Sequence, residues 1–185
     1  MGEHRNFIGG EWVGAAGGAV YATRNPARPD ECLGKFPDST AADVAAAVDA
    51  AWKARGAWAS TPAPQRAAIL FRFAQLLEDS AAELGRIVTL EQGKAIGEAT
   101  GEVLRAAAEA RFMAGEALRP IGTTYPNDRA ASGCYTVAEP LGVVATICPW
   151  NFPVVTPVRK IAPALAWGNT VVFKPASLTP WSAVE

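Results

Sequence analysis

Two apolar runs separated by a helical segment constrain the fold of this chain more than any other feature. Residues 142–148 are almost all apolar and are bounded by Gly and Pro, which is typical of a parallel strand buried on both faces. Residues 170–173 have the same character, and the segment 153–167 between the runs favours a helix that ends at Gly168 and Asn169. Together they predict a βαβ unit with a right-handed crossover, the opening of a doubly wound parallel sheet, and therefore an α/β fold.

The part of the chain before this unit combines strands and helices. Residues 6–37 alternate short apolar stretches with Gly, Asn and Pro turn signals, which predicts two or three short strands. Four helices are expected to follow, and their starts are Thr40 or Ser39, Thr61, Ser80 with a capping box to Glu83, and Ala95. Gly93 is expected to end the third helix, and Pro120 and Gly122 the fourth. Their apolar stripes predict core packing: Val44, Val48, Trp52, Ile69, Leu70, Phe73, Leu76, Leu77, Leu84, Ile87 and Val88.

The remaining segments divide the chain into three expected parts. Residues 1–118 hold the strands and helices just described, and 119–140 form a polar loop with a strand near 134–138. Residues 141–185 hold the start of the parallel sheet. A sheet of two parallel strands cannot cover its own edges, and a helix beginning at Thr179 has nothing after it to pack against. We therefore expect the chain to be truncated.

Composition excludes several classes of protein. Half of the 185 residues are hydrophobic, 19% are charged and the formal net charge is −1, which is the profile of a globular protein without a basic face for nucleic acid. No apolar run is long enough to span a bilayer, so no membrane contact is expected. Cys32, Cys134 and Cys148 have neither disulfide-framework nor metal-ligand spacing, which indicates a cytoplasmic protein with no metal site. His4, the only histidine, lies at a terminus that is expected to fray.

The ends of the two predicted strands carry the residues suited to chemistry. Open α/β sheets bind ligands outside the carboxyl ends of their strands. The first strand leads into Pro-Trp-Asn-Phe-Pro at 149–153 and the second into Lys-Pro-Ala-Ser at 174–177. If the strands are neighbours, an indole, an amide and an ammonium group converge on one crevice. Neither a G-x-G-x-x-G loop nor a P-loop occurs in the sequence, so no glycine-rich phosphate cradle supports this site.

These segments and others resemble the aldehyde dehydrogenase family, and the resemblance covers essentially the whole chain as the amino-terminal part of such an enzyme. The motifs that carry it, in chain order, are Phe7-Ile8-Gly9-Gly10-Glu11-Trp12, Asn25-Pro26, Glu91-Gln92-Gly93-Lys94, Trp150-Asn151-Phe152-Pro153, Pro163-Ala164-Leu165, Gly168-Asn169 and Lys174-Pro175-Ala176. Any one of these short motifs is unremarkable, whereas the ordered set is specific.

The resemblance implies a role for Asn151. In this family a cysteine thiolate attacks the aldehyde, and an amide side chain and a backbone N–H hold the resulting oxyanion. Asn151 matches that amide, and its NH₂ group is a neutral donor suited to developing negative charge. The alternative is an Asn that only caps the helix beginning at Pro153.

The resemblance also implies a dinucleotide site. Lys174 matches the lysine that holds the adenosine ribose, with a solvated strand-end lysine as the alternative. Many NAD-preferring members carry Glu where this chain has Ser177, and a small hydroxyl beside Lys174 accepts a 2′-phosphate that a carboxylate would repel, so we predict NADP use, with NAD as the alternative. The expected cofactor-binding residues are Ile147, Cys148, Pro149, Trp150, Asn151, Lys174, Pro175, Ala176 and Ser177.

Arg159 and Cys148 complete the set of candidates. Arg159 matches the arginine that clamps the distal carboxylate of semialdehyde substrates, and a solvated helix arginine is an equally weighted alternative. Cys148 ends a buried strand without a nearby base, where burial raises the pKa of a thiol, so we do not predict it to be the nucleophile. The charged residues of 95–118 are expected to form a solvated or subunit-facing surface.

The resulting expectation is the front part of an NAD(P)-dependent enzyme that oxidises a small aldehyde, and in the longer enzyme a homo-oligomer. By the resemblance, the nucleophilic cysteine and the glutamate base lie beyond residue 185, so residues 1–185 alone are expected to be inactive. The rival interpretations are a non-catalytic dinucleotide-binding or assembly module, and an unrelated α/β protein.

Overall fold

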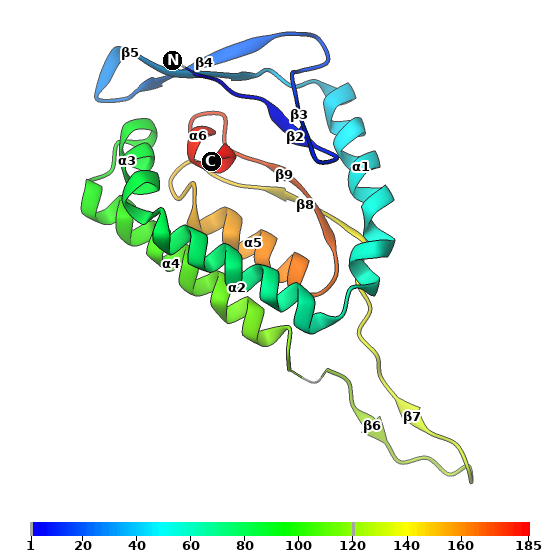
Figure 1. Ribbon diagram of the computed structural model, residues 1–185. Coiled ribbons are helices and arrows are strands. Elements are labelled where there is room, and N and C mark those ends of the chain that lie inside the picture. Colours follow the sequence, from blue (N-terminus) through cyan, green and yellow to red (C-terminus); the bar gives the residue numbers. More distant parts are fainter. Residues whose placement is uncertain (1, 120) are drawn as a thin grey trace.

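The computed structural model describes residues 2–119 and 121–185. A layer of helices lies on one side of a short parallel sheet, a ribbon of strands lies on the other, and an extended arm projects from the body (Figure 1). The elements in chain order are β1 (Gly2–Glu3), β2 (Asn6–Ile8), β3 (Glu11–Val13), β4 (Val20–Asn25), β5 (Arg28–Pro37), α1 (Ala41–Ser60), α2 (Ala63–Asp79), α3 (Ala81–Gln92), α4 (Ile96–Glu116), β6 (Thr124–Tyr125), β7 (Cys134–Tyr135), β8 (Val143–Ile147), α5 (Val155–Ala166), β9 (Thr170–Lys174) and α6 (Trp181–Val184). The predicted α/β class is confirmed.

The amino-terminal strands form two small antiparallel pairings. β2 and β3 pair through a turn at Gly9 and Gly10, both of which have positive φ, and β4 pairs with β5. β1 adds to β5 in parallel. The segment at His4 is not frayed, contrary to our expectation. The His4 ring stacks on the Phe36 ring with centroids 4.5 Å apart, and the His4 backbone N–H donates to the Lys35 carbonyl at 2.9 Å.

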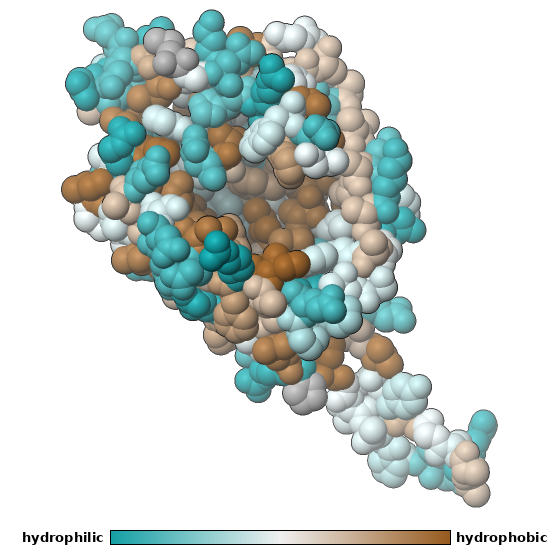
Figure 2. Space-filling model, in the orientation of Figure 1, coloured by the Kyte–Doolittle hydropathy of each residue, from teal (hydrophilic) through white to brown (hydrophobic). Residues whose placement is uncertain are grey.

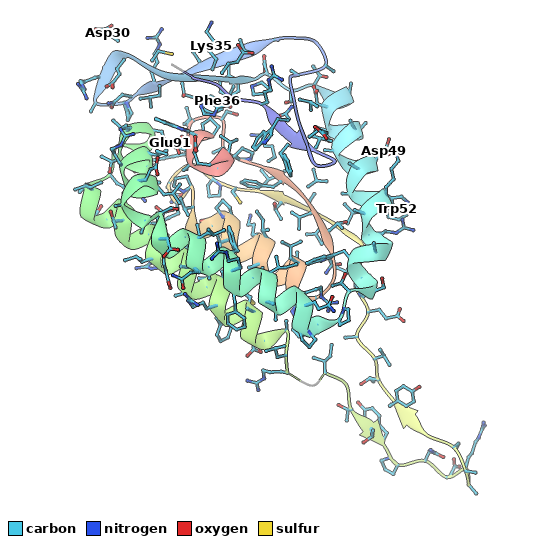
Figure 3. The ribbon with its side chains drawn as sticks, viewed as in Figure 1. Asp30, Lys35, Phe36, Asp49, Trp52 and Glu91 are labelled. Atoms are coloured by element: carbon cyan, nitrogen blue, oxygen red, sulfur yellow. The ribbon has the colours of Figure 1, made fainter. Side chains whose placement is uncertain are left out.

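Helix α1 begins where its cap predicts but buries a different face. Thr40 is the N-cap, and its capping box is completed by Asp43, whose side chain accepts from the Thr40 N–H at 2.7 Å. The stripe Val44, Val48 and Trp52 is exposed, so its predicted core role is wrong. Trp52 points away from the body (Figure 3), with the Arg55 guanidinium over its ring. The stripe lies on the outer face because α1 meets the rest of the described chain through other residues, such as Ala51 and Trp58.

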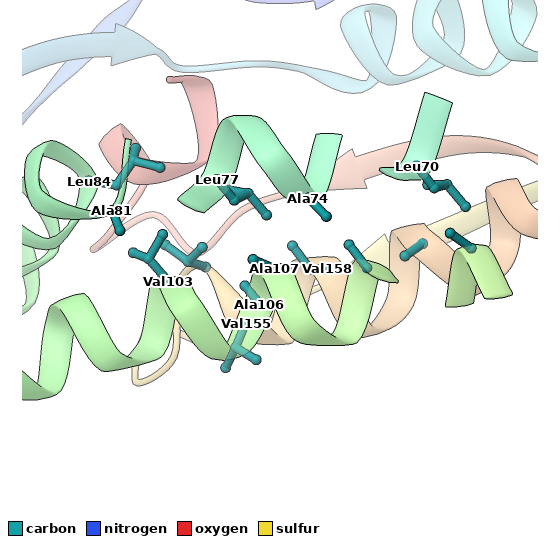
Figure 4. Close-up of a cluster of buried hydrophobic side chains, with 14 of the residues drawn as sticks. Leu70, Ala74, Leu77, Ala81, Leu84, Val103, Ala106, Ala107, Val155 and Val158 are labelled. Atoms are coloured by element: carbon teal, nitrogen blue, oxygen red, sulfur yellow. The ribbon is translucent and has the colours of Figure 1, made fainter. Parts of the chain in front are cut away.

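The core lies between α2, α3, α4 and α5, and alanine supplies much of it. Figure 4 shows Val103, Ala106 and Ala107 of α4 facing Leu77 of α2. Small side chains on α4 let the neighbouring helices approach closely, so the buried face is narrower than the predicted stripe. Exposed members of that stripe on α2 correct our expectation of core packing: Ile69, Phe73 and Leu76. Leu70, Leu77, Leu84, Ile87 and Val88 are buried as predicted.

The caps of α3 match one prediction and contradict another. Gly93 ends α3 in the left-handed conformation, with φ of 91°. Ser80 precedes α3, but its side chain makes no capping hydrogen bond, so the predicted capping box with Glu83 is wrong. The Ser80 N–H bonds to the Leu76 carbonyl and closes α2, while the Ser80 carbonyl accepts from the Leu84 N–H, so this residue joins α2 and α3 through its backbone alone.

The predicted βαβ unit is present. β8 and β9 run parallel in continuous register from Val143 opposite Thr170 to Ile147 opposite Lys174, and α5 connects them. Buried Asn169 joins the end of α5 to the start of β8, because its side chain accepts from the Gly142 N–H at 2.9 Å and donates to the Ala164 carbonyl at 3.2 Å.

The apolar run predicted a sheet that is buried on both faces, and the structure contradicts this prediction. Ile147 is 68% exposed and Ala145 is also exposed. Figure 2 shows a hollow in the middle of the molecule with hydrophobic residues on its floor. The apolar run was expected to be covered on both sides, whereas the described chain covers it with α5 and α1 only in part.

Residues 121–141 form the projecting arm (Figure 1). β6 pairs with β7 through two residues on each side, so the strand predicted over 134–138 is shorter than expected and a second short strand lies in the predicted loop. Pro120, expected to help end α4, lies outside the described residues. Several large apolar side chains of the arm are exposed: Ile121, Tyr125, Tyr135, Val137 and Leu141.

Candidate active site

The two predicted site segments leave adjacent strand ends. Ile147 lies opposite Lys174 in the register, and the Cys148 N–H donates to the Lys174 carbonyl at 3.4 Å. The segments 149–153 and 174–177 therefore start side by side, which confirms the expected juxtaposition of the strands. Their side chains, however, have different neighbours.

Asn151 lies at an open cleft of about 480 Å³ between the end of α3, the helix α4 and the start of α5. The residues that line it are Gln92, Lys94, Glu98, Gly101, Glu102, Arg105, Asn151, Phe152 and Val155. Lys174 is not among these lining residues. Asn151 is exposed, and the structure records no hydrogen bond of its side chain to the described residues, whereas its carbonyl accepts one. Val154 is the N-cap of α5 and has no side-chain cap, so the alternative in which Asn151 caps this helix is not realised.

Lys94 holds the turn that carries Asn151. Its Nζ donates to the Asn151 carbonyl at 3.0 Å and to Glu102 Oε2 at 2.5 Å. The same Nζ lies 4.3 Å from the ring centroid of Phe152, a cation–π distance. Only 10% of the Lys94 side chain is exposed, so these contacts, rather than water, stabilise the charge of its ammonium group.

Glu102, which lies on the neighbouring helix α4, accepts hydrogen bonds from the backbone N–H groups at the start of α5. Its side chain is 2% exposed, and Oε1 accepts from the N–H groups of Val154 at 2.8 Å and Val155 at 3.1 Å. The first N–H groups of a helix lack partners within it, and a carboxylate there is favoured by the helix dipole.

Sequence reasoning missed Glu102 because it assigned the charged residues of 95–118 to a surface. A usable signal existed, since Glu102 follows Ala99 by three residues and precedes Ala106 by four, which places it on the buried alanine face. Its burial corrects that expectation.

The second segment has its own surroundings. Lys174 and Ser177 are both exposed, with Nζ 3.4 Å from the Ser177 hydroxyl, and the phenol of Tyr21 lies near Ser177. Burial raises the pKa of Tyr21, with nearby carboxylates adding to the effect, so the phenol is neutral at physiological pH. The cation beside Ser177 is the ammonium group of Lys174.

Glu91 anchors the chain after this segment. Its carboxylate accepts from the N–H groups of Trp181 at 2.7 Å and Ser182 at 2.9 Å, and from the Ser182 hydroxyl. Figure 3 shows Glu91 beside α6. Desolvation by burial raises the pKa of this carboxyl group, and the hydrogen bonds from Ser182 and Trp181 oppose the shift.

The other candidates lie nearby but outside the cleft. Arg159 binds Glu109 of α4, with Nε and Nη2 at 2.9 and 2.7 Å from Oε1, and about half of its side chain is exposed. Lys160 donates to the Ile147 carbonyl at 2.6 Å. The Cys148 side chain is buried, which raises the pKa of its thiol, and Lys160 opposes this only in part. Such a thiol is a poor nucleophile.

Four further site candidates are described by their exposure and backbone contacts. Trp150 is half exposed and its carbonyl accepts from the Thr179 hydroxyl at 3.4 Å, while Pro149 is exposed and Pro175 and Ala176 are half-buried. Among residues 2–119 and 121–185, no cluster of three or more His, Cys, Asp or Glu side chains has metal-site geometry. Within the same residues, no helix has the length and apolarity needed to cross a bilayer.

Comparison with known proteins shows to which family the chain belongs. The model of the aldehyde dehydrogenase family matches residues 12–185. The chain belongs to this family. This aldehyde dehydrogenase chain is 43% identical over 181 residues to an alpha-ketoglutarate semialdehyde dehydrogenase of Haloferax volcanii, covering 98% of the chain and 38% of the relative. It is also 43% identical over 178 residues to a succinate-semialdehyde dehydrogenase [NADP(+)] of Escherichia coli, covering 96% of the chain and 37% of the relative.

Solved structures agree with this membership. An NADP-dependent glyceraldehyde-3-phosphate dehydrogenase from Bacillus halodurans, complexed with NADP, superposes with a TM-score of 0.94 at 36% identity. The match covers all of the aldehyde dehydrogenase chain and 40% of the solved one. The chain thus spans somewhat more than a third of the length of its relatives.

Proposed function

We propose that this chain is the amino-terminal part of an NAD(P)-dependent enzyme that oxidises an aldehyde to the carboxylic acid. The observation that carries the proposal is Asn151: its backbone is held by Lys94, while its side-chain amide stays free at the mouth of a cleft. A preorganised donor of this kind stabilises negative charge that develops on an aldehyde oxygen, an effect worth about 3 kcal/mol. In this role the side chain of Asn151 binds the oxygen and performs no proton transfer.

The dinucleotide site is proposed at the ends of β8 and β9, with 2′-phosphate recognition by Lys174 and Ser177. The residues present fit that group, because Lys174 and Ser177 are exposed, lie together, and include no carboxylate. When bound, the dinucleotide accepts the hydride. The proposed contacts are the ones expected from the sequence: Ile147, Cys148 through its backbone, Pro149, Trp150, Asn151, Lys174, Pro175, Ala176 and Ser177. NADP is the proposed cofactor and NAD the alternative.

The substrate is proposed to be a carboxylated semialdehyde, with Arg159 as the clamp for the distal carboxylate. The relatives from Haloferax volcanii and Escherichia coli are named for such substrates. A guanidinium fork binds a carboxylate in two parallel hydrogen bonds. Because Arg159 pairs with Glu109 here, the substrate carboxylate has to compete with that carboxylate.

The organisation of the longer enzyme is also a proposal. We take residues 1–118 and 141–185 as parts of its cofactor-binding domain and 119–140 as an oligomerisation arm of a homo-oligomer. The exposed apolar side chains of the arm, such as Tyr135 and Val137, suit burial against another subunit. The three free cysteines suit a cytoplasmic location.

Residues 1–185 alone are proposed to be inactive, because by the family resemblance the thiol nucleophile and the glutamate base are expected outside them. Purified 1–185 is titrated with NADP by calorimetry and assayed with propanal and succinic semialdehyde. We expect no formation of reduced cofactor, and appreciable formation would contradict the proposal. Tight cofactor binding by a well-folded monomer without turnover would favour a non-catalytic binding module. A reading frame that extends past Glu185 with a cysteine and a glutamate in the family's settings would support the enzyme.

A further inference from the structure

The turn that carries Asn151 is held by polar groups rather than by its own side chains. Asn151 and Phe152 are both exposed, and the N-cap Val154 provides no side-chain oxygen for the start of α5. Apolar packing of the turn therefore begins only at buried Pro153. The orientation of Asn151 depends on what holds the backbone on each side of it.

Two side chains that lie far from this turn in the sequence hold the backbone on both sides of Asn151. Lys94 donates to the Asn151 carbonyl, on one side of the turn, and to Glu102 Oε2. Glu102 uses its other oxygen to accept from the N–H groups of Val154 and Val155, on the other side. One carboxylate and one ammonium group thus connect α4 and the end of α3 to backbone atoms flanking Asn151.

Burial of the Lys94–Glu102 ion pair is unfavourable for solvation, so a contribution to stability alone does not explain it. Both charges are removed from water, with 2% of the Glu102 side chain and 10% of the Lys94 side chain exposed. Desolvation of a buried ion pair offsets much of its attraction, and an apolar pair of similar volume is often as stable. What the ion pair adds over an apolar pair is a directional hold on the backbone atoms that it contacts.

We propose that Lys94 and Glu102 are positioning residues for Asn151, fixing its backbone so that the side-chain amide points at the aldehyde oxygen. This inference rests on the oxyanion role proposed above for Asn151. Neither residue is assigned to contact the reacting atoms. Preorganised donors lose much of their effect when displaced, and a misplacement of about 1 Å costs roughly a hundredfold in rate.

The test uses the longer enzyme and compares turnover in two backgrounds. Lys94→Met removes the hydrogen bond to the Asn151 carbonyl, and Lys94→Met combined with Glu102→Gln removes both charges so that no buried charge is left unpaired. We expect kcat to fall roughly 10- to 100-fold with KM for the aldehyde nearly unchanged. In an Asn151→Ala background, where no amide remains to be positioned, the same substitutions should cause no further fall.

A matched control separates positioning from support of α4. Glu78→Gln removes a second ion pair of α4, the one with Arg111, away from the cleft. We expect it to leave kcat unchanged. Losses from Lys94→Met and Asn151→Ala that simply multiply would overturn the positioning role, because residues acting independently have additive effects on the activation free energy.

A second measurement keeps the two proposals distinguishable. If Asn151→Ala leaves kcat unchanged, the oxyanion role fails, and positioning is judged by amide hydrogen exchange in residues 1–185. Glu102→Ala should then accelerate exchange at Val154 and Val155 about tenfold or more relative to amides in the middle of α4. Unchanged protection at both positions would overturn the positioning role as well.

Discussion

At the scale of single residues, the two proposed parts of the site, the amide of Asn151 and the ammonium group of Lys174, have different surroundings. Asn151 lies at a cleft formed by α3, α4 and α5, whereas Lys174 lies with Ser177 on the adjacent strand end. The two strands meet in register, but each side chain takes its surroundings from different elements. A shared crevice was the expectation from the sequence, whereas in the structure Lys174 does not line the cleft at which Asn151 lies.

The choice of cofactor is predicted to depend on residue 177. Ser177→Glu introduces a carboxylate beside Lys174, which repels a 2′-phosphate and can accept from a ribose 2′-hydroxyl. We expect the affinity for NADP to fall at least about tenfold, equivalent to roughly 1.4 kcal/mol, with the affinity for NAD unchanged or higher. Calorimetric titration with both dinucleotides measures this. Ser177→Ala is the control, and an equal loss of NADP affinity in both variants would show that charge is not the cause.

At the scale of elements, close helix packing depends on small residues. A Cβ at Gly85 of α3 would lie 2.5 Å from the Thr100 hydroxyl and 3.0 Å from the Thr100 backbone, which is too close without movement of α4. At Gly56 of α1 a Cβ would meet no atom within 4 Å. The absence of a side chain is therefore required at one helical glycine and not at the other.

These two glycines give opposite predictions for the same substitution. Gly85→Ala is expected to destabilise the fold by about 1–3 kcal/mol, because overpacking outweighs the gain in helix propensity. Gly56→Ala is expected to stabilise it by about 0.5–1 kcal/mol. Urea unfolding followed by circular dichroism measures both. Stabilisation by Gly85→Ala would refute the tight α3–α4 contact.

The helices also show where amphipathic patterns mislead. Val44, Val48 and Trp52 have helical spacing, yet they are exposed because α1 contacts the body through other residues. On α4 the buried face consists mostly of alanines, which a search for large apolar residues overlooks. Hydrophobic spacing identified these helices, but the size and partner of each face depend on neighbouring elements.

At the scale of the whole molecule, the described chain leaves extensive apolar surface uncovered. The hollow in Figure 2 has a hydrophobic floor, and Ile147 is 68% exposed. Apolar patches of this kind usually mark a surface that another part of a protein covers. The membership of the chain in a family whose compared members are more than twice as long agrees with that interpretation.

This surface predicts how the isolated chain behaves in solution. Residues 1–185 should bind an apolar fluorescent dye such as ANS, and the longer enzyme should bind less of it per chain. Near-ultraviolet circular dichroism serves as the control, because retained signal shows that dye binding comes from an exposed folded surface rather than from loose packing. Equal dye binding by both proteins would contradict the prediction.

The sequence by itself determined the βαβ unit, the cap that starts α1, the glycine that ends α3 and the two segments at the strand ends. These features follow from local properties: the length of an apolar run, a capping residue such as Thr40, or a glycine such as Gly93. Only the tertiary structure decided that Glu102 is buried and that Lys94 reaches the Asn151 carbonyl. The physical reason is distance along the chain: the state of a charged side chain depends on partners about fifty residues away, and no local pattern records which of them will meet.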